Sequence, residues 1–242
     1  EGEPIVFIHG AAVTSKVWEF QKEHISRHYK MIVYDLRGSG RSQKTTYINH
    51  TCELLAEDLK GLIDYLRLDK INIVGLSMGA SVAMRFAAQY AGMVKTLIIT
   101  GAIADVHGIL AFICKHFSHI IGKALMTKAG GVTAAKLMLP SCAYKDILYY
   151  HSNIINIDKD ELIKYHQILK SYTITEALGK ITCPTLILYG SLESVFHKYG
   201  RQIQEKIKNS RMVIVPGVGH GWNGEAPELF SSIIMEFIRE NS

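Results

Sequence analysis

A serine between two glycines is the residue best suited to nucleophilic chemistry in this sequence. Ser77 is the centre of residues 75–79 (GLSMG), which follow the β-branched run of residues 71–74 and precede a stretch rich in alanine. This order predicts a strand, a sharp turn and a helix, with the serine at the turn. The glycines would let strand and helix approach closely while the serine backbone is strained and its Oγ exposed. Met78 would offer its backbone N–H to an oxyanion.

The elements that must position Ser77 are strands alternating with helices. Strands are predicted at residues 4–8, 31–34, 71–74, 96–100, 185–189 and 211–215, and those at residues 4–8, 71–74 and 96–100 have the apolar pattern of buried strands. Helical patterns lie between them, at residues 15–29 and 55–66 among others, and such alternation predicts a doubly wound, mostly parallel α/β sheet. The alternation stops from residue 103 to residue 172, where the pattern is helical only.

Length and composition favour one α/β domain. The chain has 242 residues, of which 48% are hydrophobic and 20% charged, and this is enough to bury one large core. No apolar run reaches the ~18 residues of a membrane span, and the N-terminus lacks a signal-peptide pattern. We therefore expect a cytoplasmic protein without a membrane partner.

Cysteines and charges exclude other classes. Cys52, Cys114, Cys142 and Cys183 are far apart in the sequence, so neither a metal site nor a disulfide framework is indicated. The formal net charge is +5, but lysines and arginines are spread along the chain, which argues against a nucleic-acid partner.

Several further motifs accompany Ser77. Residues 9–11 (HGA) follow the first strand, residues 35–42 (DLRGSGRS) follow the second, and residues 217–230 (GVGHGWNGEAPELF) follow the last. With the serine turn, these motifs resemble the α/β-hydrolase family across nearly the whole chain outside residues 103–175. The resemblance implies an α/β-hydrolase fold, although the β-hairpin that usually precedes the first strand is expected to be absent here.

The resemblance also implies a catalytic triad in the order Ser77, Glu193, His220. His220 occupies the family's histidine position in the G-x-G-H loop, and Glu193 occupies the acid position after the penultimate strand, where aspartate is more usual. Asp105 is the alternative acid, because some members carry the acid after the preceding strand. The second oxyanion N–H falls on Ala11. Asp35 and Arg37 are expected to satisfy backbone groups of their loop rather than to act in catalysis.

The helical stretch resembles the lid of this family. We therefore predict a hydrolase core at residues 1–102 and 176–242, with a lid inserted at residues 103–175. The lid carries many large aliphatic residues and five tyrosines, which would give the substrate pocket an apolar roof with a few hydroxyl groups. Its tyrosines are Tyr144, Tyr149, Tyr150, Tyr165 and Tyr172.

The predicted activity is hydrolysis of a carboxylic ester, lactone or thioester of a small to medium apolar acyl group, with no cofactor and no metal. The alternatives are a ligand-binding receptor that retains the triad, and a cofactor-free lyase or C–C bond hydrolase. The expected partner is a small-molecule ester. Lys115, Lys123, Lys128 and Lys136 would also allow an acidic acyl-carrier protein to bind the lid.

Overall fold

The structure, a computed structural model, describes residues 2–44, 50–105, 127–142, 168 and 172–242. Six strands form a single sheet in the order β2-β1-β3-β4-β5-β6, and every pairing is parallel. The strands are β1 (Pro4–Ile8), β2 (Lys30–Tyr34), β3 (Ile71–Leu76), β4 (Val94–Thr100), β5 (Thr185–Gly190) and β6 (Ser210–Val215). The strand order reverses between β1 and β3, which confirms the predicted doubly wound sheet. In such sheets ligands bind outside the carboxyl ends of the strands at this switch point.

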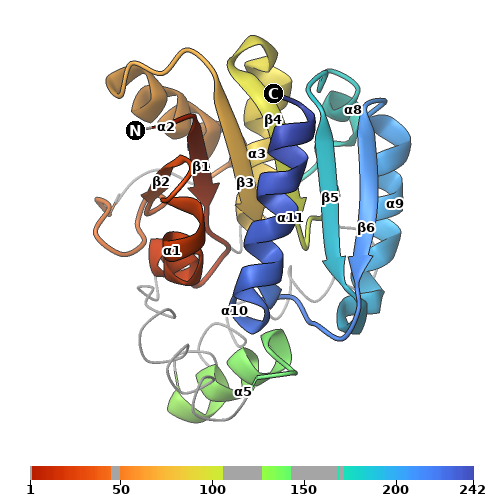
Figure 1. Ribbon diagram of the computed structural model, residues 1–242. Helices are drawn as coiled ribbons and strands as arrows, with labels where there is room; N and C mark the ends of the chain where they lie inside the picture. The colour runs from red at the N-terminus through yellow and green to blue at the C-terminus, as the bar shows by residue number, and fades with distance from the viewer. Residues whose placement is uncertain (1, 45–49, 106–126, 143–167, 169–171) are drawn as a thin grey trace.

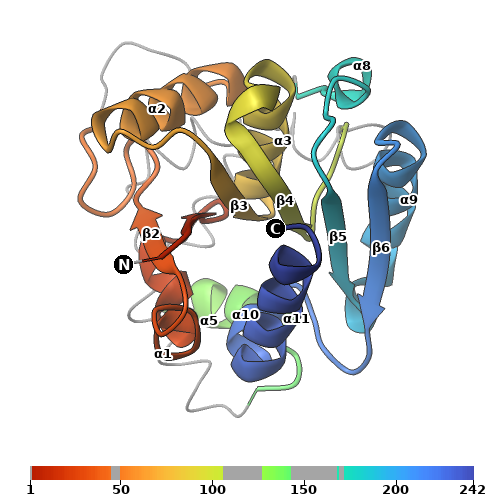
Figure 2. The same ribbon diagram turned by 45° about the horizontal axis from the view of Figure 1, so that its top comes forward.

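Helices cover both faces of the sheet (Figures 1 and 2). One face carries α2 (Cys52–Tyr65), α3 (Met78–Gln89) and α9 (His197–Lys206), and the other carries α1 (Lys22–Ile25) and α11 (Pro227–Glu240). Alternate strand residues supply the two cores: Val6 and Ile8 pack toward α2 and α3, whereas Ile5 and Phe7 pack toward α11. The inner strands β1, β3, β4 and β5 therefore read as continuous apolar runs because both of their faces are buried, whereas the edge strands β2 and β6 are partly exposed.

Short helices occupy the connections. They are the 3-10 turns η1 (Ser15–Gln21), η2 (Ala91–Met93) and η3 (Ser191–Phe196), and the single-turn helices α8 (Thr175–Leu178) and α10 (Trp222–Glu225). The helix expected over residues 15–29 is instead η1 followed by α1, since Trp18 and Gln21 are buried on one side and the chain turns again at Ser26.

The inserted segment lies between β4 and β5, and its longest helix among the described residues is α5 (Lys128–Met138). This helix lies below the carboxyl ends of the strands in Figure 1. An isolated antiparallel bridge between Asp105 and Thr173 joins the two ends of the insertion, which was expected to be helical only. Most of the predicted lid lies outside the described residues, including Lys115, Lys123, Tyr144, Tyr149, Tyr150 and Tyr165, so its boundaries remain a prediction.

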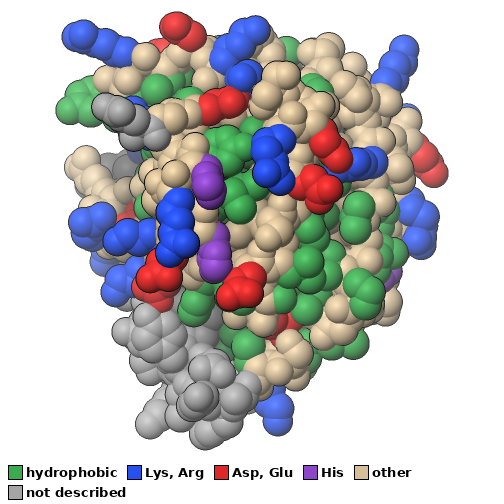
Figure 3. Space-filling model, in the orientation of Figure 1, with side chains coloured by type: hydrophobic (Ala, Val, Ile, Leu, Met, Phe, Trp, Pro, Cys, Tyr) green, Lys and Arg blue, Asp and Glu red, His purple; other side chains and the backbone are tan. Residues whose placement is uncertain are grey.

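Two further observations concern the charges on the surface and the lengths of the helices. On the face shown in Figure 3, charged side chains of both signs are dispersed around apolar groups. Within the described ranges, no helix is long and apolar enough to cross a membrane.

Candidate active site

Ser77 lies at a strained turn between β3 and α3. Its backbone has φ 54° and ψ −116°, a conformation that is unfavourable for a residue with a side chain. The Ser77 N–H donates a hydrogen bond of 2.8 Å to the Thr100 carbonyl at the end of β4, which holds the turn in place.

The two flanking glycines are sterically required, as predicted. A Cβ atom on Gly75 would lie 2.6 Å from the Gly79 carbonyl oxygen. A Cβ atom on Gly79 would lie 2.2 Å from the Ile8 carbonyl oxygen on β1. Any larger residue at either position would push strand, turn and helix apart, so the two glycines fix where Ser77 is presented.

The two backbone amides predicted to bind an oxyanion lie in segments next to Ser77. Met78 is the first residue of α3, so its N–H points out of the helix N-terminus, where the helix dipole favours negative charge. Ala11 lies in the turn after β1, and a Cβ atom on the preceding Gly10 would lie 3.4 Å from Ser77 Cβ. Among the described residues, neither N–H has a hydrogen-bond acceptor. Both N–H groups therefore keep the free donor that the predicted oxyanion role requires.

The Ala11 turn is held by His9, which belongs to the HGA motif but received no role of its own from the sequence. His9 is fully buried, its Nδ1–H donates to the Gly10 carbonyl at 2.8 Å, and its Nε2 accepts from the Leu36 N–H at 2.9 Å. One nitrogen donates and the other accepts, so the imidazole must be neutral. Burial lowers the pKa of His9 to about 4.

We expect the His9 environment to make the protein sensitive to acid. The pKa of His9 is about 4 in the folded state and about 6.5 in an unfolded chain. The unfolded state therefore takes up the proton first as pH falls. The contribution of His9 to the free energy of unfolding should be complete above pH 6.5 and should fall by roughly 3 kcal/mol toward pH 4. Urea unfolding at pH 7, 6, 5 and 4 measures this slope. The His9→Gln variant should be less stable at pH 7, but its free energy of unfolding should depend less steeply on pH. A pH dependence identical to that of wild type would contradict this role of His9.

His220 and Glu193 form the closest pair among the predicted site residues. His220 Nδ1 and Glu193 Oε2 are 2.6 Å apart. The other carboxylate oxygen, Oε1, accepts the Gly190 N–H at 2.7 Å, so Glu193 is fixed by the backbone at the end of β5. Glu193 is only 5% exposed. The carboxylate thus orients the imidazole, and no hydrogen bond to Nε2 is seen among the described residues.

The end of β4 places His220 beside the serine turn. A Cβ atom on Gly101 would lie 2.4 Å from His220 Cε1, and Gly101 directly follows Thr100, the residue that holds the Ser77 N–H. The Thr100 hydroxyl also accepts a 2.8 Å hydrogen bond from Trp222 Nε1, two residues after His220. Within the described part of the chain, Ser77 and His220 share no hydrogen bond. Hydrogen bonds between catalytic groups are often long in unliganded enzymes and shorten when substrate binds.

Asp105, the alternative acid, is engaged elsewhere. Its carboxylate accepts the Ile174 N–H at 3.1 Å and the Thr175 hydroxyl, so it ties together the two ends of the insertion. Glu193, rather than Asp105, is therefore the carboxylate in contact with His220.

The loop after β2 is architectural, as predicted for Asp35. The Asp35 carboxylate accepts the backbone N–H groups of Ser15 and Arg41 at 2.8 and 2.9 Å. The Arg37 guanidinium forms a two-point ion pair with Asp58 on α2, so Arg37 also links this loop to a helix.

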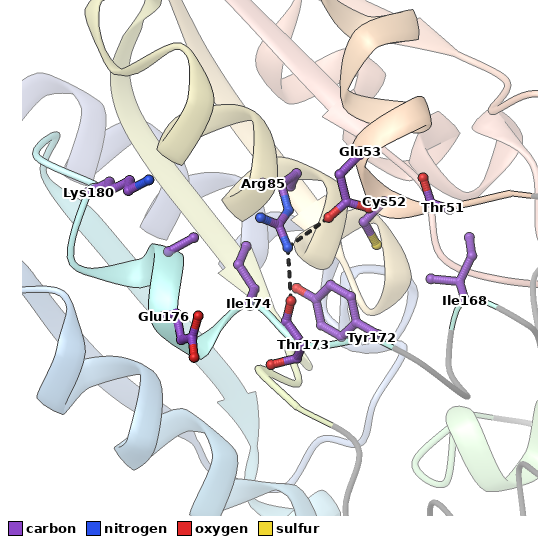
Figure 4. A pocket seen from close by; sticks show the side chains of 11 residues that line it. Thr51, Cys52, Glu53, Arg85, Ile168, Tyr172, Thr173, Ile174, Glu176 and Lys180 are labelled. Carbon is purple, nitrogen blue, oxygen red and sulfur yellow. Dashed lines mark hydrogen bonds and ion pairs between the residues drawn. The ribbon is translucent and has the colours of Figure 1, made fainter.

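A cavity of about 470 Å³ lies between α2, α3 and α8, and none of the residues proposed for the triad or the oxyanion site lines it (Figure 4). Arg85 at its centre is already engaged, with 2.8 Å to the Thr173 carbonyl and 2.9 Å to Glu53. Tyr172, expected to line the substrate pocket, borders this cavity and packs in the core. Two acidic and two basic residues line the cavity, so its formal charge is balanced. We assign no chemistry to it.

The fold and motifs match one known family. Residues 3–112 match the model described as the alpha/beta hydrolase fold. Together with the sheet order, this match shows that the chain has the alpha/beta hydrolase fold.

Two similar proteins cover nearly the whole chain, and a third covers less than half of it. An AB hydrolase superfamily protein, YisY of Bacillus subtilis (strain 168), is 27% identical over 98% of this chain and 91% of its own length. The structure of a thermophilic esterase from Thermogutta terrifontis has a TM-score of 0.85 and 27% identity, covering 100% of this chain and 91% of that chain. A 2-hydroxy-6-oxo-2,4-heptadienoate hydrolase of Pseudomonas putida is 32% identical over 42% of this chain and 38% of its own length.

Proposed function

We propose that the protein is a serine hydrolase that cleaves a carboxylic ester through an acyl-enzyme. The observation that carries this proposal is the 2.6 Å contact between His220 and a buried carboxylate, beside a strained serine turn. The likeness to the Thermogutta terrifontis esterase supports ester hydrolysis among the reactions of this family.

In the first half-reaction, Ser77 Oγ attacks the ester carbonyl carbon while His220 Nε2 takes the hydroxyl proton. Glu193 stabilises the imidazolium that forms and keeps Nδ1 protonated. The carbonyl oxygen becomes an oxyanion between the N–H groups of Ala11 and Met78. The intermediate then collapses: the ester C–O bond breaks and His220 gives its proton to the leaving alcohol.

In the second half-reaction, water attacks the acyl-enzyme carbonyl and His220 takes a proton from it. The second tetrahedral intermediate expels Ser77 Oγ, which recovers its proton, and the carboxylic acid leaves. Every step uses only side chains, backbone amides and water. Each oxyanion donor typically contributes ~2.7–4 kcal/mol to lowering the barrier, so the turns that hold Ala11 and Met78 matter as much as the triad.

The proposal is tested by a serine-directed phosphonate combined with a panel of oxygen esters, thioesters and lactones. We expect one phosphonate on the peptide that contains Ser77, and turnover of oxygen esters. Rapid labelling without turnover of any member of the panel would instead favour a receptor or a lyase.

A second candidate is hydrolysis of a carbon–carbon bond, because one relative is a 2-hydroxy-6-oxo-2,4-heptadienoate hydrolase. The same triad could act on such a substrate. Assaying a 2-hydroxy-6-oxo dienoate beside the ester panel separates the two candidates, since the preferred substrate will have the larger kcat/KM.

We expect the enzyme to favour apolar acyl chains. Every methylene buried in an apolar pocket is worth up to ~0.8 kcal/mol, so kcat/KM should rise over the first carbons of the acyl chain and level off where the pocket ends. The measurement is kcat/KM for p-nitrophenyl esters from acetate to decanoate. The matched control is the same series with wild-type protein already labelled by phosphonate, which should show only background hydrolysis. A flat profile would contradict an apolar acyl pocket.

A further inference from the structure

Glu225 joins two separate backbone segments on either side of the His220 loop. Its Oε2 accepts the Gly219 N–H at 2.5 Å, directly before His220 in the chain. Its Oε1 accepts the Ser141 N–H at 2.9 Å, just after α5 in the inserted segment. One carboxylate therefore connects the histidine loop to the insertion.

The two segments are also packed against each other without spare room. The Gly221 N–H donates to the Met138 carbonyl at 2.8 Å. A Cβ atom on Gly219 would lie 2.4 Å from Pro140 Cδ. With a carboxylate on one side of His220 and a backbone hydrogen bond on the other, the loop can shift only if residues 138–141 shift with it.

The hydrogen-bond pattern requires a carboxylate. Two N–H donors from different segments each reach a separate oxygen of Glu225, so keeping both bonds in this arrangement needs two acceptor atoms. A glutamine offers one oxygen, and its NH₂ group would face the second N–H. An aspartate has two oxygens but is one methylene shorter, so it cannot reach both donors from the same backbone position.

We infer that Glu225 is a positioning residue that couples His220 to the inserted segment, so that turnover depends on how residues 138–141 sit against the histidine loop. This inference rests on the proposed function, because His220 is taken as the general base. Glu225 lies outside the triad and acts only through the Gly219 and Ser141 amides.

The test compares Glu225→Gln and Glu225→Asp with Glu228→Gln, which removes the same charge from an exposed position on the first turn of α11. Active sites are first titrated with phosphonate to completion, and kcat is expressed per titrated site. This removes the effect of a smaller folded fraction. We expect both Glu225 variants to lose on the order of tenfold to a hundredfold in kcat per site, with KM changing less. Glu228→Gln should match wild type.

Hydrogen–deuterium exchange provides a readout independent of activity. We expect Glu225→Gln to speed exchange in residues 216–222 and in residues 138–142 together, with Glu228→Gln unchanged. Unaltered exchange in either segment, or kcat per site within twofold of wild type, would overturn the inference. Wild-type protein that neither labels nor hydrolyses would overturn the proposed function instead, and exchange would still decide whether Glu225 couples the two segments.

Discussion

Replacing Ser77 by alanine should abolish phosphonate labelling and lower ester turnover by a factor on the order of 10⁶, as loss of the nucleophile does in comparable triads. The substitution removes only Oγ and keeps Cβ, so the turn geometry and its 2.8 Å bond to Thr100 should be retained. Intact-mass analysis after phosphonate treatment and kcat on the best ester measure the two losses.

The thermal midpoint provides the control for this substitution. Ser77→Ala should melt close to wild type, because the backbone strain at φ 54° is unchanged. Ser77→Gly should be more stable than Ser77→Ala by about 1 kcal/mol, since glycine adopts a positive φ without a steric penalty. Substantial ester hydrolysis by either folded variant would mean that another residue is the nucleophile.

Replacing Glu193 by glutamine should lower kcat by about 10⁴, the cost of the equivalent change in a well-studied triad. The structure explains why the effect should be large. The Gly190 N–H donates to one oxygen of Glu193 and would retain the oxygen of glutamine, so the NH₂ group would face His220 Nδ1. Nδ1 would then have to accept, which places the proton on Nε2 and blocks the uptake of the serine proton.

Asp105→Asn provides the matched comparison for the Glu193 variant. Asp105 binds backbone and hydroxyl groups at Ile174 and Thr175, so its replacement should affect stability while leaving kcat per titrated site within a few-fold of wild type. Measuring kcat and the thermal midpoint for both variants separates the two roles. A larger loss of kcat for Asp105→Asn would reverse the assignment of the acid.

The parts of the site that could be predicted from the sequence are those with a local cause. The serine turn needs glycine on both sides for steric reasons within a few residues, and the strands are marked by continuous apolar runs. Glu193 and His220 were predicted by family resemblance, and the structure brings them within hydrogen-bonding distance of each other.

The supporting contacts could not be predicted because they join residues far apart in the chain. Thr100 serves both Ser77 and Trp222, and Glu225 binds an amide of the insertion, yet neither role leaves a local pattern. The helix expected at residues 15–29 was wrong for a similar reason, since burial of Trp18 and Gln21 against distant segments overrides the helical spacing.

The position of β4 in the sheet has a consequence for synthesis of the protein. β4 pairs with β5, although residues 101–184 separate the two strands in the chain. A nascent chain can therefore form the part of the sheet that contains β1, β2, β3 and β4 before β5 has been synthesised. Until then, one edge of β4 has no partner strand. Loop closure over such a distance is slow, and an unpaired apolar edge invites association with other chains. Because Glu193 and His220 follow β5 and β6, the proposed triad can form only after β5 has paired with β4.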